Sequence, residues 1–461
     1  MATKGAAPGT PWTWPRACDD HRHRSATGTE IGADTQLSPF SRILDNGLQV
    51  LALECRTAPV ASLWVWYRVG VRNEYPGITG ISHWVEHMLF KGTERWSAGA
   101  ADQAIARVGG IFNGLTWYDF TTFYETLAVD QLALALDIES DRMRGTTFTP
   151  EAVTAERTVV ISERQGHENS PSFLLSEEVN AAAFRVHPYG HETIGHLCDL
   201  LAITRDDLQR HHDTYYTPNN AVVAVAGDVQ HPEVTERIAE AFGDIPSGPT
   251  VPEVRAVEPS QRGPRRVVVH GAGETDYVEI VYHVPPATHP DFHPLTVLNA
   301  ILAGGSGFLV GRGHITNHTS RLYGTLVDRE YAVDIHGSLA PTLDPGLYRL
   351  SATVWPGQRQ EALEEAVDNQ LERLQETLVS AAELTKAQQQ ARAMFAYASE
   401  SISNQAFWLG FSNIFADDVW FSTYLESIAA VTPEDICRVA QTYLVPNNRT
   451  TGWYVGDGKT D

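Results

Sequence analysis

Two histidines and a glutamate lie close together in the segment His83-Trp-Val-Glu86-His87. On a helix, His83 and His87 are one turn apart and point the same way, so their imidazoles can hold one zinc ion. Glu86 lies on the same side and can reach a water molecule on that metal. Zinc activates water and polarises carbonyl groups, while a carboxylate takes the proton and delivers it to a leaving amine. The HxxEH order therefore predicts a zinc peptidase site.

The elements that would position these residues can be read from the surrounding sequence. The apolar spacing within Gly80–Thr93, which follows a Pro76-Gly77 turn, predicts a helix that carries both histidines. A second helix should begin near Pro150, because Thr149 is a good N-cap and Glu151 places an acid in the first turn. The plainer alternative is that His83 and His87 are two partly exposed helix histidines beside a surface glutamate.

An internal repeat predicts the domain organisation. Residues Ile203–Asn220 and Val431–Asn448 align without gaps, with eight identities and a shared Pro-Asn-Asn ending, and a strand-like run follows each. Strand-like runs alternate with helical ones, so we expect an α/β (α+β) protein made of two tandem homologous domains, each a mixed sheet covered by helices. The predicted parts are a flexible arm (1–40), a catalytic domain (41–244), a proline-rich linker (245–266) and a non-catalytic repeat domain (267–461).

Composition excludes several classes of protein. The 461 residues include 34 Lys and Arg against 57 Asp and Glu, a net charge of -23, which argues against binding nucleic acid. Four cysteines without a CxxC pair exclude a disulfide framework. No apolar run is long enough for a secretory signal or a membrane span, so the sequence predicts a soluble, cytoplasmic protein that does not bind membranes.

Several segments between residues 43 and 457 carry a family resemblance: Leu44–Leu48, Gly80–Thr93, Gly109-Gly110, Ala155–Glu163, the HPYG stretch from His187, and both Pro-Asn-Asn repeats. Together they resemble the pitrilysin and insulinase family of inverzincin zinc metallopeptidases. The similarity is to the short two-domain type that includes mitochondrial processing peptidase, and within it to the zinc-bearing beta-type subunit. The processing-peptidase metalloenzyme fold is therefore expected.

The resemblance assigns further residues to the site. It implies one zinc ion per chain, held by His83, His87 and Glu163, with Glu86 as the general base. It also implies that Glu156 supports catalysis. Since Glu156 and Glu163 are two helical turns apart, both carboxylates should share one helix face.

The segment Phe112–Tyr124 resembles the family's edge strand, to which an extended substrate adds as another strand. The resemblance implies that Phe112, Asn113 and Gly114 bind substrate, with Asn113 orienting the scissile peptide. A turn-forming role for Asn113 is the alternative. Gly114 replaces the alanine usual in the family, which should loosen the backbone.

The second domain departs from the family pattern. Pro294 should break the helix where a metal ligand would stand, and an insertion, Phe308–Thr319, separates two family segments. The position of the family's substrate-gripping arginine holds Val327, and Arg329 and Tyr331 are out of register with the expected arginine and tyrosine. The resemblance then implies a heterodimer in which a paralogous subunit supplies the missing arginine and tyrosine; a homodimer is the alternative.

The resulting prediction is a zinc-dependent endopeptidase that cuts extended peptides, such as targeting or leader segments, inside a closed chamber. A catalytically silent scaffold within a larger complex is the alternative. The other histidine groups are not expected to bind metal: His187, His191 and His196 lie in a Pro-Tyr-Gly loop, and His314 and His318 lie in a stretch of Gly, Thr and Asn with no nearby carboxylate.

Overall fold

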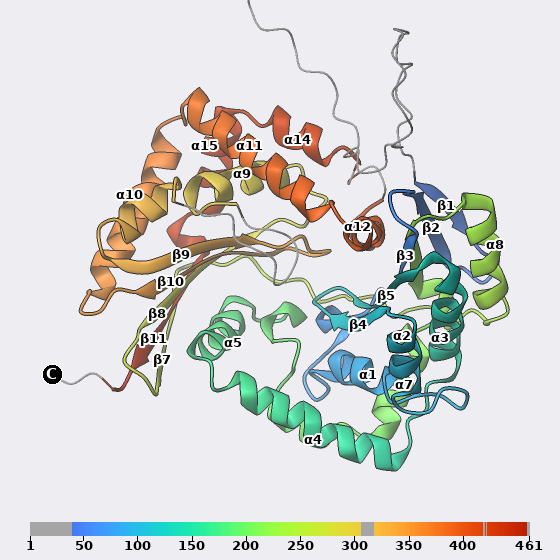
Figure 1. The fold of residues 1–461 in the computed structure, drawn as a ribbon. Coiled ribbons are helices and arrows are strands. Elements are labelled where there is room, and N and C mark those ends of the chain that lie inside the picture. Colours follow the sequence, from blue (N-terminus) through green and yellow to red (C-terminus); the bar gives the residue numbers. More distant parts are fainter. Residues whose placement is uncertain (1–38, 306–317, 418–419, 421, 459–461) are drawn as a thin grey trace, which may run out of the picture.

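The computed structural model describes residues 39–305, 318–417, 420 and 422–458, and its strands form two sheets (Figure 1). The first sheet has the order β1-β2-β6-β3-β5-β4 and the second β7-β11-β8-β10-β9. Each sheet is mixed, because β2–β6 and β7–β11 are parallel pairs among antiparallel ones. The strands are β1 (Phe40–Ile43), β2 (Gln49–Glu54), β3 (Val60–Tyr67), β4 (Ile111–Thr116), β5 (Thr121–Ala128), β6 (Ala221–Gly227), β7 (Arg265–Gly271), β8 (Tyr277–Val284), β9 (Ala332–Leu339), β10 (Gly346–Val354) and β11 (Arg449–Gly456).

Helices cover both sheets, which confirms the predicted fold class. In the first half these are α1 (Ile81–Leu89), α2 (Ala100–Arg107), α3 (Leu132–Gly145), α4 (Pro150–His167), α5 (Pro171–Ala183), α6 (Leu197–Ala202), α7 (Arg205–Tyr215) and α8 (His231–Phe242). In the second half they are α9 (Phe292–Leu302), α10 (Gln360–Glu376), α11 (Ala381–Ala398), α12 (Ile402–Phe415), α14 (Tyr424–Ala430) and α15 (Pro433–Tyr443). Short helical turns include η2 (Val71–Asn73), η4 (Pro188–Gly190) and a π-helical turn, η6 (Tyr323–Val327).

The repeated sequence segments form the same local structure in both halves. Helices α7 and α15 each begin with a capping box, Thr204 with Asp207 and Thr432 with Asp435. Each Pro-Asn-Asn ending forms a short 3-10 turn that leads directly into a strand, β6 or β11. The repeat identified in the sequence is therefore a structural repeat.

The two halves exchange helices across their boundary. Helix α5 of the first half packs on β7, β8 and β11, and helix α12 of the second half packs on β2, β3 and β6 (Figure 1). Trp66 on β3 lies 5.1 Å from the Phe407 ring of α12, and a Cβ at Gly410 would come within 2.1 Å of the Trp66 indole nitrogen. The hydrophobic core thus continues through both halves. The predicted domain limits, 41–244 and 267–461, are limits along the chain and remain predictions. The packing of α5 and α12 crosses from one of these segments to the other.

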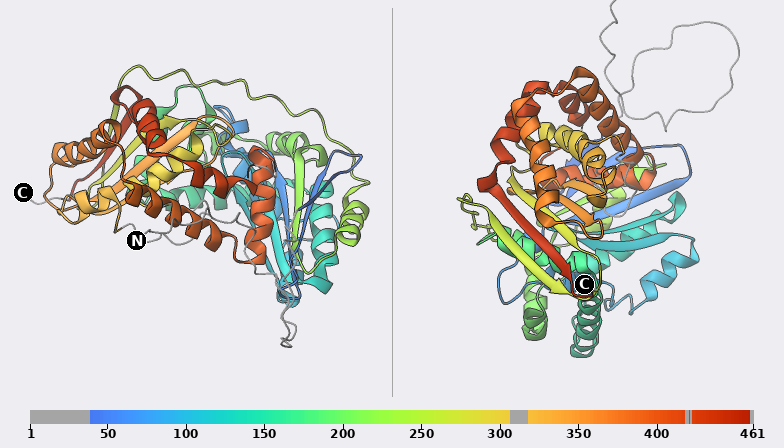
Figure 2. Two further views of the ribbon diagram at one scale, coloured as in Figure 1. Left: turned by 90° about the horizontal axis from the view of Figure 1, so that it is seen from above. Right: turned by 90° about the vertical axis from the view of Figure 1, so that its left-hand side faces the viewer.

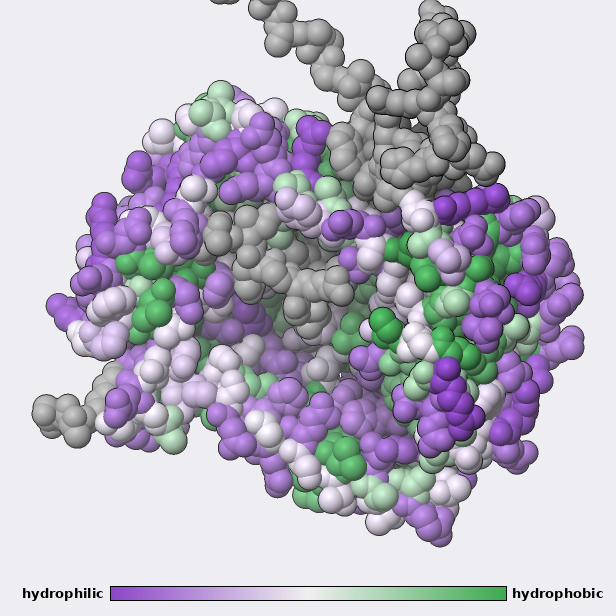
Figure 3. Space-filling model, viewed as in Figure 1, coloured by the Kyte–Doolittle hydropathy of each residue, from purple (hydrophilic) through white to green (hydrophobic). Residues whose placement is uncertain are grey.

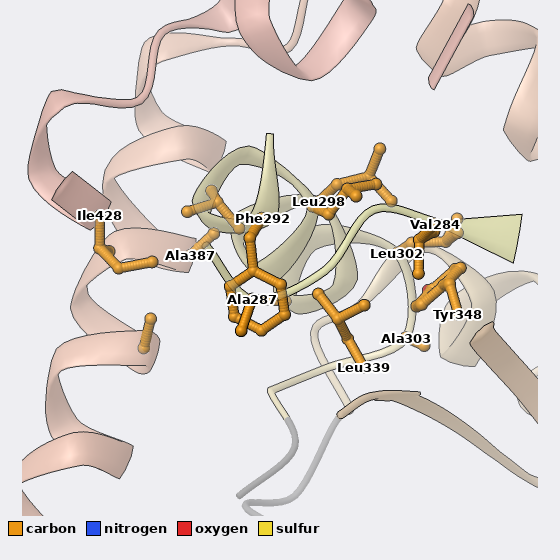
Figure 4. Packing of buried hydrophobic residues seen from close by; sticks show 14 of the residues in the cluster. Val284, Ala287, Phe292, Leu298, Leu302, Ala303, Leu339, Tyr348, Ala387 and Ile428 are labelled. Atoms are coloured by element: carbon orange, nitrogen blue, oxygen red, sulfur yellow. The ribbon is translucent and has the colours of Figure 1, made fainter. Parts of the chain in front are cut away.

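Helix α9 corrects the prediction that Pro294 breaks the helix at this position. The helix runs from Phe292 to Leu302, with Pro294 in its first turn. A proline is tolerated there, because the first backbone N–H groups of a helix have no partner within it. Figure 4 shows Phe292 and Leu298 of α9 among the buried side chains of the second half, together with Ile428.

The chain between the halves has no regular secondary structure from residue 246 to 264, and β7 begins at Arg265, inside the predicted linker. It runs along one side of the molecule (Figure 2, left). The face in Figure 3 is mainly hydrophilic. Within the described residues, no helix combines the length and apolar character that a membrane span requires. Cys55 is disulfide-bonded, and Cys198 and Cys437 are free thiols.

Candidate active site

Helix α1 presents the two histidines of the motif side by side. The rings of His83 and His87 are 4.5 Å apart between centroids and nearly perpendicular. The apolar residues between and around them are buried in the first-half core, which fixes the rotation of the helix. The side chains of His83 and His87 are only 14% and 20% exposed, so both lie in a largely desolvated position.

Helix α4 brings Glu163 to the same point. One carboxylate oxygen of Glu163 lies 3.9 Å from Nε2 of His83 and 3.4 Å from Nε2 of His87. Ligand atoms of these three residues all lie within 4.8 Å of one another, and no other such group of three occurs among the residues the structure describes. Helix α4 begins at Pro150 with Thr149 as its N-cap, as the sequence predicts. Two imidazole nitrogens and one carboxylate oxygen are the donor set of a catalytic zinc site, so these residues fit zinc.

The protonation of the two histidines differs. Burial and the neighbouring charge of His87 lower the pKa of His83 to about 4. Burial alone would also lower the pKa of His87, but hydrogen bonds to Glu156 and Glu163 raise it to about 9. The hydrogen bond from His87 holds the pKa of Glu163 below its usual value. In the metal-free chain, a proton on His87 therefore occupies the position that a cation would take.

Glu156 lies behind the site rather than in it. Its carboxylate is almost fully buried and is 2.9 Å from Nδ1 of His87 and 2.5 Å from Nζ of Lys91. Burial acts to raise the pKa of Glu156, but these two cationic partners lower it overall. Because Glu156 holds Nδ1, the Nε2 atom of His87 is directed toward Glu163. Glu156 and Glu163 share a face of α4, and only Glu163 reaches the cluster of ligand atoms.

Glu86 projects from α1 toward the edge strand. It is 8% exposed, and the hydroxyl of Thr116 at the end of β4 donates a 2.7 Å hydrogen bond to its Oε2. Burial raises the pKa of Glu86, and the Thr116 bond partly opposes this change. A carboxylate with a raised pKa beside the metal ligands is suited to accept and return a proton. The role of Thr116 could not be predicted from the sequence, since one threonine in a β-rich run carries no distinguishing signal.

The predicted single strand Phe112–Tyr124 is wrong. The chain forms a hairpin of β4 and β5, in which Trp117 N–H donates to the Phe120 carbonyl across a turn. β4 is an edge strand, paired with β5 alone among the described strands. Three of the four turn residues, Trp117, Tyr118 and Phe120, are aromatic and continue the β pattern, which is why periodicity merges the two strands.

Phe112, Asn113 and Gly114 all lie on β4. Asn113 is exposed, and its side-chain oxygen accepts a hydrogen bond from Gly114 N–H. A Cβ at Gly114 would lie 3.0 Å from the rings of both Phe90 and Phe123, so this glycine gives room for aromatic packing beneath the strand. Next to the strand is a cavity of about 330 Å³, lined partly by Phe112 and Asn113.

The histidines that are not expected to bind metal make other contacts. His191 lies 2.8 Å from the buried carboxylate of Glu74, whose oxygens accept hydrogen bonds from the first turn of α1. His187 lies 3.1 Å from Asp344 of the second half, and His196 lies 3.6 Å from Glu177. His314 lies outside the described residues, as does most of the Phe308–Thr319 insertion. His318 stacks on Tyr323.

The second half contributes no metal-ligand group among its described residues. Val327 ends the π-helical turn η6, Arg329 is exposed in the turn after it, and Tyr331 lies just before β9. Tyr331 is partly buried against the second-half core, and its carbonyl accepts a hydrogen bond from Trp355 N–H. Arg329 and Tyr331 therefore lie in the turn that connects η6 to β9.

A zinc-type donor set on two helices, beside the edge strand of a two-sheet α/β frame, is an arrangement typical of a metallopeptidase. The family model "Insulinase (Peptidase family M16)" matches residues 49–196, and "Peptidase M16 inactive domain" matches residues 202–391. The chain belongs to peptidase family M16, the family identified by resemblance in the sequence.

Relatives agree with this assignment. The "Zinc protease PqqE" of Helicobacter pylori is 30% identical over 92% of this chain and 94% of its own length. A probable mitochondrial-processing peptidase subunit beta of Arabidopsis thaliana is 30% identical over 60% of this chain and 53% of its own length. The crystal structure of a protease from Helicobacter pylori matches with a TM-score of 0.85 and 29% identity, over 90% of this chain and 99% of that one.

The position of Glu156 leads to a prediction about proton release. At pH 7, His87 with a pKa of about 9 is protonated in the metal-free chain, so zinc must displace that proton. Replacing Glu156 by glutamine removes a charge that raises this pKa. We expect Glu156→Gln to release fewer protons on binding zinc, by up to about one at pH 7. The zinc affinity of each chain should rise with pH until His87 has lost its proton. In Glu156→Gln this limit should be reached at a lower pH than in the parent chain.

Titration calorimetry in buffers of different ionisation enthalpy measures this release. Glu94→Gln is a matched control, because Glu94 is exposed and lies just beyond α1. Equal proton release by all three chains would contradict the assignment of Glu156 as the partner that keeps His87 charged.

Proposed function

We propose that this chain is a zinc-dependent endopeptidase in which His83, His87 and Glu163 hold one zinc ion. The convergence of their ligand atoms within 4.8 Å, beside the buried Glu86, is the observation that carries the proposal. Zinc bound there would supply Lewis acidity, which polarises a carbonyl group and lowers the pKa of water.

The roles of the chain's own residues follow from their positions. Glu86 is the general base, and it returns the proton to the leaving amine. Thr116 orients the Glu86 carboxylate through its 2.7 Å hydrogen bond. Glu156 is a positioning residue, because it contacts His87 and not the cluster of ligand atoms.

The substrate is an extended peptide that adds to the free edge of β4. Phe112, Asn113 and Gly114 supply backbone groups along that edge, and the exposed Asn113 orients the peptide. An edge strand binds a chain only in extended form, so targeting or leader segments and other short unfolded peptides are the substrate class. The net charge of -23 favours basic peptides.

A paralogous subunit supplies the arginine and tyrosine that grip the substrate, and the two subunits close around a chamber in the cytoplasm. Two observations support this arrangement. Val327 occupies the family's arginine position, and Arg329 and Tyr331 lie in the turn between η6 and β9, out of register with the expected arginine and tyrosine. The alternative arrangement is a homodimer.

A quenched-fluorescence peptide library tests the function with the purified chain alone, a chelator control and elemental analysis for zinc. Chelator-sensitive cleavage supports the peptidase and shows that a monomer or homodimer suffices. Bound zinc without cleavage, followed by cleavage when a paralogue is added, supports the heterodimer. A chain that binds no zinc, or binds it and stays inactive with every paralogue, would contradict the proposal and leave a scaffold role.

A further inference from the structure

The turn between β9 and β10 of the second half is docked on the first half beside the edge strand. Its backbone is held by Asp119, at the tip of the β4–β5 hairpin. Asp119 accepts a 3.1 Å hydrogen bond from Leu343 N–H through one carboxylate oxygen and the hydroxyl of Tyr189 through the other. Asp344 N–H in turn donates to the Tyr189 hydroxyl oxygen at 3.3 Å.

The side chain of Asp344 completes this contact. Its Oδ2 lies 2.6 Å from Nε of Arg72 on η2 and 3.1 Å from Nε2 of His187 next to η4. The second-half turn is thus bound by three separate segments of the first half: η2, the β4–β5 turn and η4. We call these contacts, made by Arg72, Asp119, His187, Tyr189, Leu343 and Asp344, the hairpin latch.

Asp119 is an unusual residue to bury in such a contact. It is 1% exposed and no cation lies within ion-pair distance of it in the described residues, so its burial carries a desolvation cost. Its two oxygens instead bind one backbone N–H and one hydroxyl, which fixes the hairpin tip relative to the second half. A carboxylate kept at this cost is better explained by positioning than by stability.

The hairpin tip is directly connected to the proposed general base. Thr116, the last residue of β4, pairs with Thr121 across the turn that contains Asp119. The hydroxyl of Thr116 donates to Glu86, and no other side-chain hydrogen bond to Glu86 is present in the described structure. A shift of the hairpin tip therefore moves the group that orients Glu86.

We propose that Asp119 is a positioning residue through which the second half of the chain sets the orientation of Glu86. The connection runs from Leu343 to Asp119, along the hairpin to Thr116, and from Thr116 to Glu86. The inference rests on the proposed peptidase function. It gives the second half of the chain, which has no metal-ligand group among its described residues, a role in catalysis that does not require a substrate-binding arginine or tyrosine.

A double-mutant cycle on kcat tests the connection, using whichever assembly cleaves peptides. Thr116→Val removes the hydroxyl, and Asp119→Ala releases the hairpin tip; each should lower kcat by about 10- to 100-fold with zinc content unchanged. If Asp119 acts through Thr116, the double variant should be no slower than Thr116→Val alone. Multiplied effects, or a normal kcat in Asp119→Ala, would overturn the proposal.

Gln49→Ala is the matched control, because Gln49 makes a 2.9 Å hydrogen bond to Asn413 between the halves, on β2 and away from the hairpin. It should leave kcat unchanged. If Asp119→Ala does not fold, Asp119→Asn keeps the shape and one acceptor, and it enters the cycle instead with a smaller loss expected.

Hydrogen exchange separates failure of this inference from failure of the peptidase function. Even in a chain without activity, amides of residues 111–128 should exchange faster in Asp119→Ala than in Gln49→Ala. Unchanged exchange there would overturn the latch, whatever the activity.

Discussion

Replacing Glu86 by glutamine is expected to lower kcat by roughly 10²- to 10⁴-fold while zinc remains bound. Glutamine keeps the size of the side chain, and its oxygen can still accept the Thr116 hydroxyl, which lies 2.7 Å from Glu86 in the parent chain. It cannot accept a proton from water. The ligand atoms come from His83, His87 and Glu163, so the metal should not be lost.

Two measurements decide this prediction: kcat on a cleaved peptide and metal content by elemental analysis. Glu94→Gln is the matched control and should behave like the parent chain, because Glu94 is exposed. A Glu86→Gln chain that kept most of its activity would remove Glu86 from the mechanism. A chain that lost zinc would show that Glu86 helps to hold the metal.

The motif, the repeat and the main helices could be predicted because each depends on local sequence. His83 and His87 are one turn apart on any helix, and the Thr149-Pro150 start of α4 is encoded by capping preferences. The repeated Thr-Asp capping boxes likewise follow from a few neighbouring residues. Glu163 is different, since only the family resemblance connected it to a motif on another helix.

Features that depend on long-range packing could not be predicted. Helices α5 and α12 have ordinary amphipathic or apolar sequences, and nothing in them indicates that each covers the sheet of the other half. The contact of Lys91 with Glu156 and that of Thr116 with Glu86 join residues on different elements. The hairpin was missed because its turn, Trp117–Phe120, has aromatic residues that also favour strands.

The HPYG stretch shows why residue type alone misleads. His187 carries the same imidazole as a metal ligand, yet in the fold it lies beside Asp344 and next to the turn that presents Tyr189 to Asp119. The stretch therefore joins the two halves of the chain. No hydrogen bond of the stretch reaches His83, His87 or Glu163 within the described structure.

Replacing Glu163 by glutamine is expected to weaken zinc binding by more than about 100-fold, beyond the 10- to 100-fold typical of a residue that only supports a ligand. Glu163 is the one carboxylate whose oxygen lies near Nε2 of both histidines, at 3.9 and 3.4 Å. Without its charge, the two imidazoles remain as the only ligands from the described cluster. Competition with a chromogenic chelator measures the dissociation constant. The thermal stabilisation on adding zinc should fall in parallel, since it depends on the ratio of free zinc to that constant.

Glu151→Gln is the matched control for this change, because Glu151 is on the same helix, α4, and is exposed. It should bind zinc like the parent chain.

The order of zinc affinities is the decisive result. Glu163→Gln should bind zinc more weakly than Glu156→Gln at a pH above about 9, where the proton on His87 no longer competes with zinc. An equal or reversed order would mean that Glu156 and not Glu163 completes the metal site, with α4 shifted by two turns relative to α1. The pairing of Glu156 with Lys91 argues against that arrangement, since a carboxylate already held by an ammonium group is a poorer ligand for a second cation.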